Sequence, residues 1–372
     1  MPLIEVFTTR QAEGWTSALE QCALYDFYHL PAYHALAEEQ GEGVAHLFLY
    51  REDAYQIALP LLLRDLDEQW PGPSPAPGSR DATSVYGYAG PVCTHSDIPE
   101  QVVQHFQTAL RGWLGDLQVV NVFSRLHPLL SQRDLLAGLG DFAVSRTVSI
   151  DLTLSPGAQY SRIRRSFREA INRLRRKGLT CVEDVEGSYL EDFYRIYHET
   201  MQRVGAAERF FFPLSYFKRL REGLGSRLHL FVCLRDGKAL SAGLFVACNG
   251  ILQYHLGGSL DEALSLAPMK LLMDEVRLWA TSQGLRILHL GGGTTASPED
   301  PLLYFKQGFS DRTHEFAAWR WIVIPEVYQR LCEEKARWNA QQDLQPAIPD
   351  YFPEYRCRCV PRQASAAPRR CP

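Results

Sequence analysis

The spacing of hydrophobic residues alternates between helical and extended patterns along the whole chain. From 268 to 283, Met269, Leu272, Met273, Val276 and Ala280 recur at helical spacing, which buries one face against a sheet. Short apolar or alternating runs predict strands. The pattern predicts two helices within 12–40, further helices at 98–114, 158–177, 188–204, 213–223, 268–283 and 325–340, and strands at 44–50, 55–63, 86–92, 117–123, 142–154, 228–235, 239–247, 251–256, 285–290 and 314–324.

These elements predict an α/β protein with mixed (α+β) sheets and two halves. Residues 1–154 form the first half, and residues 155–340 form the second, which opens with a helix at 158–177. The second half predicts a meander of three strands followed by a helix and a further strand. Residues 341–372 contain six prolines and few regular signals, so we expect a Pro-rich tail.

Composition narrows the class of protein. The chain has 372 residues, of which 46% are hydrophobic and 22% are charged, so it can bury a sizeable core without disulfides or metals. Its N-terminus has no basic segment followed by an apolar run, and no stretch of about 18 apolar residues occurs. We therefore expect a cytoplasmic protein with no integral membrane segment.

Charge is distributed unevenly. The net charge is −4, from 39 basic and 43 acidic residues, which argues against a general coat for DNA or RNA. Between Arg162 and Lys177, however, eight basic residues accompany one acid, Glu169, giving +7 locally. Such a patch suits phosphates; the alternative is a solvated face that pairs with Glu183, Asp184 and Glu186. The candidate phosphate ligands are Arg164, Arg165, Arg168 and Arg175.

Several catalytic motifs are absent from the sequence. It has no Gly-x-Ser-x-Gly elbow, no phosphate-binding Gly-x-x-x-x-Gly-Lys-Ser/Thr loop, no His-Glu-x-x-His and no dinucleotide-binding Gly-x-Gly-x-x-Gly. Nine cysteines are scattered without a Cys-x-x-Cys pair. Cys357, Cys359 and Cys371 could bind a metal or oxidise, but their spacing is poor for a metal site, so no metal and no bound cofactor are predicted.

The most informative stretch runs from Leu288 to Phe309. A predicted strand ends in Gly291, Gly292 and Gly293, which lets the backbone turn and approach a ligand closely. An acidic loop follows, and then Phe305-Lys306 precedes a Gly-Phe bend. A lysine presented in this way could stabilise developing negative charge; the alternative is a solvated lysine beside a core phenylalanine.

This stretch resembles the Fem family of aminoacyltransferases and their GNAT-like relatives, which have a strand–Gly-Gly segment followed by Phe-Lys-x-Gly-Phe. Three more stretches are similar to family segments: the basic helix with Arg168-x-x-Ile171, the segment from Tyr194 to Arg203, and the strand end from Tyr254 to Ser259. The resemblance is best over 150–325. It implies two tandem GNAT-like lobes that form an amide bond.

The resemblance also implies roles for individual residues. Lys306 stabilises the oxyanion and Phe305 shapes the pocket. Arg203 anchors a carboxylate or phosphate of the acceptor, or instead pairs with Glu199 one turn earlier. The further substrate-binding candidates are Tyr254, Tyr304, Gly292 and Gly293. Asp300 is expected to cap a helix rather than orient Lys306, and His255 and His289 are expected to be buried strand histidines.

The implied donor is aminoacyl-tRNA and the acceptor is an amine on a cell-wall precursor or small molecule. One alternative is an acyl-CoA-dependent N-acyltransferase of polysaccharide or secondary metabolism; another is an inactive GNAT-like binding module. The GNAT pyrophosphate loop is absent, since Asp261 and Glu262 stand in its place and would repel a pyrophosphate. A lysine expected one turn after Tyr33 is replaced by Ala37-Glu38, which argues against a nucleotide-linked acceptor.

Overall fold

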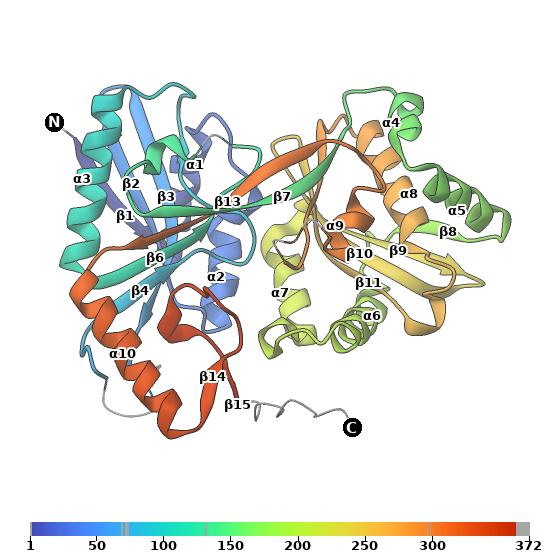
Figure 1. Ribbon diagram of the computed structural model, residues 1–372. Coiled ribbons are helices and arrows are strands. Elements are labelled where there is room, and N and C mark those ends of the chain that lie inside the picture. Colours follow the sequence, from blue (N-terminus) through green and yellow to red (C-terminus); the bar gives the residue numbers. More distant parts are fainter. Residues whose placement is uncertain are drawn as a thin grey trace, which may run out of the picture.

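The computed structural model describes residues 2–67, 70, 74–130, 132–295, 297 and 299–361. In these residues thirteen strands form one sheet, in the order β1-β2-β3-β4-β6-β13-β7-β12-β11-β10-β9-β8, with β5 paired to β3. Figure 1 shows two lobes side by side, joined by the long strands β7 and β13. The mixed α/β architecture predicted from the sequence is therefore confirmed.

The first lobe is a sheet covered on both faces. Alternation along β2 sends Leu47 and Leu49 into one core with Trp15, and Phe48 and Tyr50 into another core with Phe106. Helices α1 and α2 thus cover one face, and α3 covers the other. The elements of this lobe are β1 (Leu3–Thr8), α1 (Ala12–Glu20), α2 (Pro31–Glu39), β2 (Val44–Glu52), β3 (Tyr55–Asp65), β4 (Arg80–Thr83), β5 (Val92–Cys93), α3 (Glu100–Asp116) and β6 (Val119–Arg125).

The second lobe has the strand order predicted for it. Strands β9, β10 and β11 form an antiparallel meander, and α8 then returns the chain so that β12 lies parallel to β11. Its elements are α4 (Pro156–Arg162), α5 (Arg165–Arg176), β8 (Thr180–Glu183), α6 (Leu190–Arg203), α7 (Leu214–Leu224), β9 (Leu228–Arg235), β10 (Lys238–Cys248), β11 (Ile251–Ser259), α8 (Met269–Ser282), β12 (Ile287–Gly292) and α9 (Pro301–Lys306).

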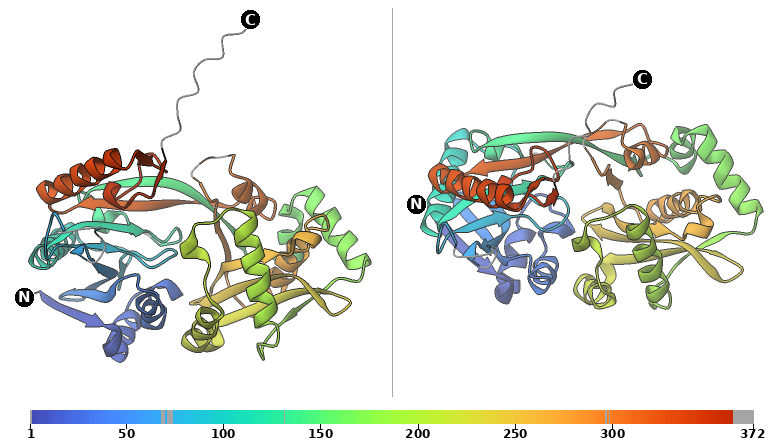
Figure 2. Two further views of the ribbon diagram at one scale, coloured as in Figure 1. Left: turned by 90° about the horizontal axis from the view of Figure 1, so that it is seen from below. Right: turned by 60° about the horizontal axis from the view of Figure 1, so that its bottom comes forward.

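Two strands cross between the lobes. β7 (Asp141–Asp151) pairs with β12 of the second lobe, and β13 (Thr313–Ile322) pairs antiparallel with both β7 and β6. Both strands span the two lobes along one side of the molecule (Figure 2). The division of the chain at residue 154 stays a prediction, and the pairing shows that the lobes are interwoven across it.

Two predicted elements are wrong in detail. The basic helix is broken into α4 and α5, because Ile163 and Arg164 adopt extended ψ angles of 133° and 136°. Ile163 is buried there, and the Arg164 N–H donates to the Gly308 carbonyl (2.8 Å). Residues 86–91 of the strand predicted at 86–92 form a loop, in which Gly87 has φ +128° and packs against the ring of Tyr28, and only Val92 lies in a strand, β5. Strands β1 and β8 and the short helix α9 were not predicted.

The C-terminal segment returns to the first lobe (Figure 2). Helix α10 (Pro325–Gln341) packs near β6, and β14 (Leu344–Pro346) pairs with β15 (Cys359–Pro361). The Tyr355 hydroxyl lies within hydrogen-bond distance of buried Asp81 (2.9 Å) and Asn121 (2.6 Å), so this segment is attached to β4 and β6. Residues 362–372, including Cys371, lie outside the described part of the chain. Over the described residues, no helix is long and apolar enough to cross a bilayer.

Candidate active site

The site begins where two parallel strands part. β11 and β12 pair only at Ile251–Ile287, Leu252–Leu288 and Gln253–His289. Beyond these pairs β12 stays with β7, through an irregularity between His289 and Gly291. The edge of β12 that no longer faces β11 therefore has backbone groups that side chains can bind.

Steric constraints explain why each residue of the Gly291-Gly292-Gly293 turn is a glycine. Gly291 has φ +78°, which disfavours any residue with a Cβ. A Cβ on Gly292 would lie 2.8 Å from the Arg146 carbonyl oxygen, and one on Gly293 would lie 2.5 Å from the Asp300 carboxyl group. The triple glycine lets this turn pass tightly between β7 and the start of α9.

Lys306 reaches the turn from the end of α9. Its side chain is buried, and Nζ donates to the Gly292 carbonyl oxygen (2.7 Å) and lies 5.8 Å from the centre of the Tyr254 ring. Burial lowers the pKa of Lys306 to about 7, although the negative charge of Asp300 opposes this shift. Two of its three N–H groups have no acceptor among the described residues, and a buried cation of this kind is suited to charge that develops during a reaction.

Asp300 caps α9, as the sequence predicted. Its carboxylate accepts from the N–H groups of Leu302 (2.9 Å) and Leu303 (3.0 Å), and from the backbone and hydroxyls of Thr294 and Thr295. Burial alone would raise the pKa of Asp300, but these hydrogen bonds outweigh it and hold the pKa low. The cap thus fixes the approach of α9 and keeps a negative charge near Lys306.

The other aromatic candidates lie on different sides of Lys306. Tyr254 faces it, and burial raises the pKa of its phenol. Phe305 instead packs against Phe167 (5.7 Å between ring centres) and Phe309 (5.3 Å), where it joins α9 to α5. Tyr304 is 59% exposed, and the Arg164 guanidinium stacks over its ring at 4.1 Å. Gly292 is therefore brought together with Lys306, whereas Tyr304 points toward α5.

Arg203 is held by the loop that follows β11. It donates to the Ser259 carbonyl (3.1 Å) and to Thr200 Oγ1 (3.1 Å), and it pairs with Asp261. The alternative partner, Glu199, instead accepts from the Asp261 N–H. Arg203 thus secures the loop at the position of the missing pyrophosphate motif.

The basic residues of α4 and α5 differ in their pairing. Arg165 pairs with Glu169, and Arg175 pairs with Asp274 and Glu275 of α8. The guanidinium groups of Arg164 and Arg168 lie over aromatic rings and form no ion pair with another described residue. None of the acids Glu183, Asp184 and Glu186 forms a described ion pair with this patch; Glu183 pairs with His229. Lys270, which the sequence analysis did not single out, stacks on Phe167 at 4.1 Å.

A buried polar network beneath the site joins the lobes. Asp26 Oδ2 lies 2.8 Å from His127 Nε2 and accepts from Gln253 Nε2 (2.6 Å), while Gln253 Oε1 lies 2.6 Å from His289 Nδ1. Burial lowers the pKa of His289 well below its ordinary value, so the imidazole is neutral. His289 and His255 are buried strand histidines. The sequence did not reveal this network, since its members are far apart in the chain.

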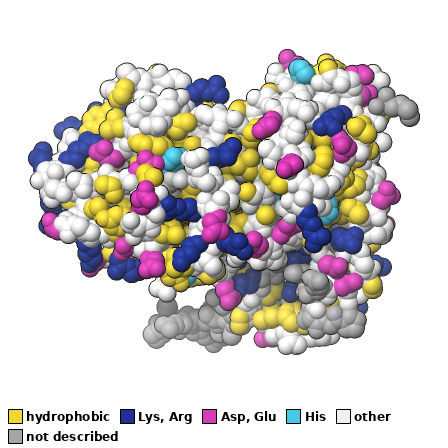
Figure 3. Space-filling model, turned by 180° about the vertical axis from the view of Figure 1, so that it is seen from behind, with side chains coloured by type: hydrophobic (Ala, Val, Ile, Leu, Met, Phe, Trp, Pro, Cys, Tyr) yellow, Lys and Arg dark blue, Asp and Glu magenta, His cyan; other side chains and the backbone are white. Residues whose placement is uncertain are grey.

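The tyrosine Tyr88 was also missed. It lies in the loop after β4, yet its hydroxyl accepts from the Gly292 N–H (3.2 Å) and its ring lies 5.3 Å from that of His289. Its only signal in the sequence was its place between Gly87 and Gly90. The first lobe therefore contributes directly to the Gly292 turn. A space-filling view shows a notch between the two lobes (Figure 3).

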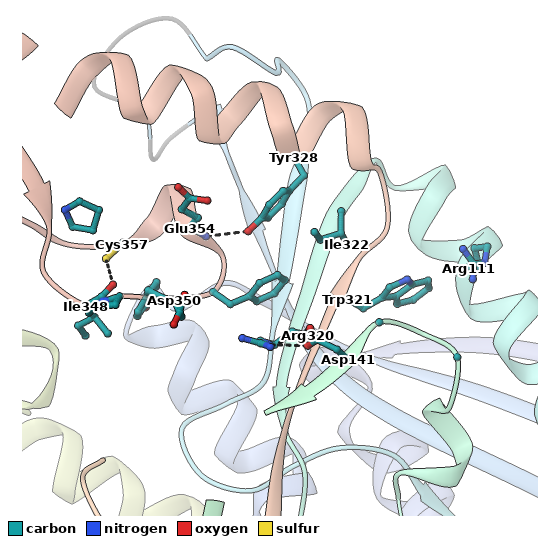
Figure 4. Close-up of a pocket in the computed structure, with 16 residues that line it drawn as sticks. Arg111, Asp141, Arg320, Trp321, Ile322, Tyr328, Ile348, Asp350, Glu354 and Cys357 are labelled. Atoms are coloured by element: carbon teal, nitrogen blue, oxygen red, sulfur yellow. Dashed lines mark hydrogen bonds and ion pairs between the residues drawn. The ribbon is translucent and has the colours of Figure 1, made fainter. Parts of the chain in front are cut away.

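A cavity of about 710 Å³ lies elsewhere, against the C-terminal segment (Figure 4). Its walls include the Arg320–Asp141 ion pair (2.7 Å), Trp321 beneath Arg111, and Tyr328. None of the predicted site residues lines it. Cys357 is at its edge, but no group of metal-binding side chains occurs in the described residues.

Comparisons with known proteins find similarity over the part of the chain that contains these residues. A family model for an acetyltransferase (GNAT) domain matches residues 161–306, which run from the end of α4 through Lys306. The UDP-N-acetylmuramoylpentapeptide-lysine N(6)-alanyltransferase of Weissella viridescens is 27% identical over 213 residues, 56% of this chain. The chain is thus similar to a GNAT domain over part of its length and to a Fem-type alanyltransferase. It matches 59% of the length of that curated relative.

Two solved structures have a similar fold over most of the chain. The crystal structure of FemX has a TM-score of 0.65 at 14% identity, over 88% of this chain and 99% of that one. The structure of L-PGS from Bacillus licheniformis has a TM-score of 0.52 at 15% identity, over 82% of this chain and 91% of that one. At these identities the likeness shows the fold alone, and it confirms the GNAT-like architecture predicted from the sequence.

Proposed function

We propose that this protein transfers an aminoacyl group from aminoacyl-tRNA to an amine, with Lys306 as the group that stabilises the reacting carbonyl. The observation that supports this most is the buried Lys306 ammonium at the glycine turn, beside the parting of β11 and β12. A GNAT domain ends at this lysine, and the curated relative is named as an alanyltransferase.

The reaction needs little beyond charge stabilisation. The nitrogen lone pair of the acceptor attacks the ester carbonyl carbon, a C–N bond forms, and the carbonyl π electrons move onto oxygen. When this intermediate collapses, the C–O bond to the ribose breaks, and the proton lost by the amine ends on the departing oxygen. A protonated Lys306 binds the negative oxygen best, so its lowered pKa sets the pH range in which it acts.

A cluster of unpaired cations lies where a charged donor would approach α9. We call Arg164, Arg168, Arg173 and Lys270 the cationic cluster; none of them has an ion pair among the residues described. Burial lowers the pKa of Lys270, as do the positive charges of Arg173 and Arg164. Such repulsion is relieved when a polyanion binds. The exposed Tyr304 adds a stacking surface of the kind that binds unpaired nucleotides.

An acyl-CoA donor fits the second lobe less well. In the loop before α8, Asp261 pairs with Arg203 and Glu262 pairs with Lys238. These acids oppose a pyrophosphate near the helix N-terminus, where anions otherwise bind. The loop therefore supports RNA rather than CoA as the donor.

The acceptor is proposed as an amine without a nucleotide diphosphate. Arg203 is engaged with Asp261, and Glu38 accepts from the Ala45 N–H (2.7 Å) and from Thr9 Oγ1, so neither position offers a free cation to phosphate. Tyr254 and the Gly292-Gly293 turn are the proposed acceptor contacts near Lys306. This leaves cell-wall precursors that lack the nucleotide, and small-molecule amines.

Donor competition tests the proposal. Purified protein is given tRNA charged with labelled amino acids, acetyl-CoA and a panel of amines that includes Nα-acetyl-lysine. We expect label to reach an amine in an RNase-sensitive way, with acetyl-CoA unused. Consumption of acetyl-CoA alone would establish the acyl-CoA alternative, and failure to bind or consume either donor would support an inactive binding module.

The cationic cluster has its own test. Changing Arg164, Arg168 and Lys270 to serine should weaken tRNA binding at least tenfold and lower the slope of log affinity against log salt by about 2. Arg195→Ser is the matched control, because Arg195 is exposed on α6 and Asp192 is its one ion-pair partner in the described part of the chain. A triple variant with the slope of the wild type would show that the cluster does not bind the donor.

A further inference from the structure

We propose that the Tyr88 hydroxyl and the Lys306 ammonium form a two-donor oxyanion site in the space left open by Gly291. This inference rests on the proposed acyl transfer and adds a catalytic residue from the first lobe. Tyr88 has no part in the motifs that resemble the Fem family, all of which lie between 150 and 325 apart from loose matches near residues 26–33.

The two donors face one empty position. A Cβ placed on Gly291 would lie 3.2 Å from Lys306 Nζ and 3.5 Å from the Tyr88 hydroxyl oxygen, and no other described heavy atom would lie within 4 Å of it apart from Gly291 and its chain neighbours. This position is too close to the Gly291 Cα for a substrate atom, but the two distances place both donors on the same side of Gly291, facing one another. We infer that a substrate oxygen bound just beyond the Cβ position accepts from both groups.

Both donors are held by the same residue. Lys306 donates to the Gly292 carbonyl (2.7 Å), and Tyr88 accepts from the Gly292 N–H (3.2 Å). The hydroxyl oxygen is therefore fixed while its own proton has no acceptor among the described residues. Of the three N–H bonds of Lys306, one is used. Each side chain has a proton left to donate.

The Tyr88 ring is positioned by packing from both lobes. It meets the rings of His289 (5.3 Å, 78°) and Phe316 (5.3 Å, 78°) edge-on, and that of Tyr28 at 5.8 Å. Gly87, next to it, must be glycine because a Cβ there would lie 2.0 Å from the Tyr28 ring. Burial raises the pKa of Tyr88 to about 12, although the Gly292 N–H opposes this shift, so the phenol keeps its proton at neutral pH.

The proposed oxyanion site would act when the amine attacks the ester carbonyl. As the amine forms the C–N bond, the carbonyl π electrons move onto oxygen, and the two groups donate hydrogen bonds to that oxygen without giving up their protons. When the C–O bond breaks, the electron pair returns to the carbonyl. Donors fixed before the reaction stabilise the intermediate more than the substrate, so Tyr88 should affect kcat rather than KM.

The test compares two tyrosine variants in the full chain. Tyr88→Phe keeps the ring and removes the hydroxyl, and Tyr28→Phe is the control, since Tyr28 belongs to the same aromatic cluster and makes no described hydrogen bond. With charged tRNA and an amine, we expect kcat of Tyr88→Phe to fall about 100-fold with KM within threefold. Tyr28→Phe should stay near the wild-type rate, and both should melt within 3 °C of it.

The outcomes separate this inference from the proposed function. If Lys306→Ala is inactive but Tyr88→Phe has a wild-type kcat, the second donor is refuted and the transferase proposal stands. If Tyr88→Phe raises KM with kcat unchanged, Tyr88 binds substrate and is not an oxyanion donor. If the wild type transfers nothing from any donor, the proposed function fails, and this inference fails with it.

Discussion

Replacing Lys306 by methionine should make the protein more stable while abolishing transfer. Methionine has a similar length and no charge, so it fills the buried space without the cost of desolvating an ammonium group. A buried lysine that destabilises the folded protein is expected at a position where the side chain serves the reaction rather than the fold. The variant therefore separates a catalytic Lys306 from one that is kept for structure.

The size of the stability gain expected for Lys306→Met follows from the lowered pKa of Lys306. The unfolded chain holds this proton up to about pH 10.5 and the folded protein only up to about pH 7. Burying Lys306 therefore lowers the stability of the folded protein by about 5 kcal/mol below pH 7 and by about 2 kcal/mol at pH 9. Methionine cannot form the hydrogen bond to the Gly292 carbonyl, and this loss offsets the gain by about 1 kcal/mol. The net gain is then about 3 to 4 kcal/mol at pH 6 and about 1 kcal/mol at pH 9.

Thermal unfolding measures this gain. With an unfolding entropy that scales with chain length, about 3 kcal/mol raises Tm by about 4 °C in a chain of this size. We expect that shift for Lys306→Met at pH 6 and a shift of about 1 °C at pH 9, with Arg195→Ser unchanged at both. Equal shifts at the two pH values, or a loss of stability at both, would refute a buried lysine that titrates near neutrality.

Three further changes test the surroundings of Lys306. Gly291→Ala fills the space between the donors and strains a backbone at φ +78°, so kcat should fall at least 100-fold; near-normal turnover in single-turnover assays would contradict the geometry. Asp300→Asn removes a negative charge that raises the pKa of Lys306, so the fall in rate at high pH should begin at a lower pH than in the wild type, and an unmoved pH–rate profile would disprove this coupling. Arg175→Ser breaks the pair with buried Asp274, so it should lower stability by about 1 to 3 kcal/mol in urea unfolding but leave tRNA affinity within threefold; a large loss of affinity would return Arg175 to the donor site.

Local patterns predicted most of the elements because helical and strand periods are properties of short segments. The 268–283 helix and the β9–β11 meander were predicted to within a few residues. The break at Ile163 could not be predicted, since it depends on Gly308, which is distant in sequence and accepts from the Arg164 N–H. The pairing of β13 with β6 and β7 across the two lobes could not be predicted either, because it joins segments that are distant in sequence and have no local signal for it.

The residues of the candidate site also fall into two groups: those that a local motif indicates and those that only the fold brings together. Lys306, Asp300 and the glycine turn lie within sixteen residues, so one motif indicated them together. Tyr88 and Lys270 approach from distant segments, and only folding brings them to α9 and α5. Charge counting located the basic patch but could not distinguish the paired Arg165 and Arg175 from the unpaired members, because the pairing depends on which acids lie within reach.

The central claim is that Lys306 drives transfer of an aminoacyl group from tRNA. The most direct measurement is the single-turnover rate of label transfer from charged tRNA to an amine at pH 6.5, in the wild type and in Lys306→Ala, with tRNA affinity measured in parallel. We predict RNase-sensitive transfer that slows at least 100-fold in the variant while tRNA affinity changes less than threefold. Equal transfer rates in the two proteins would contradict the claim.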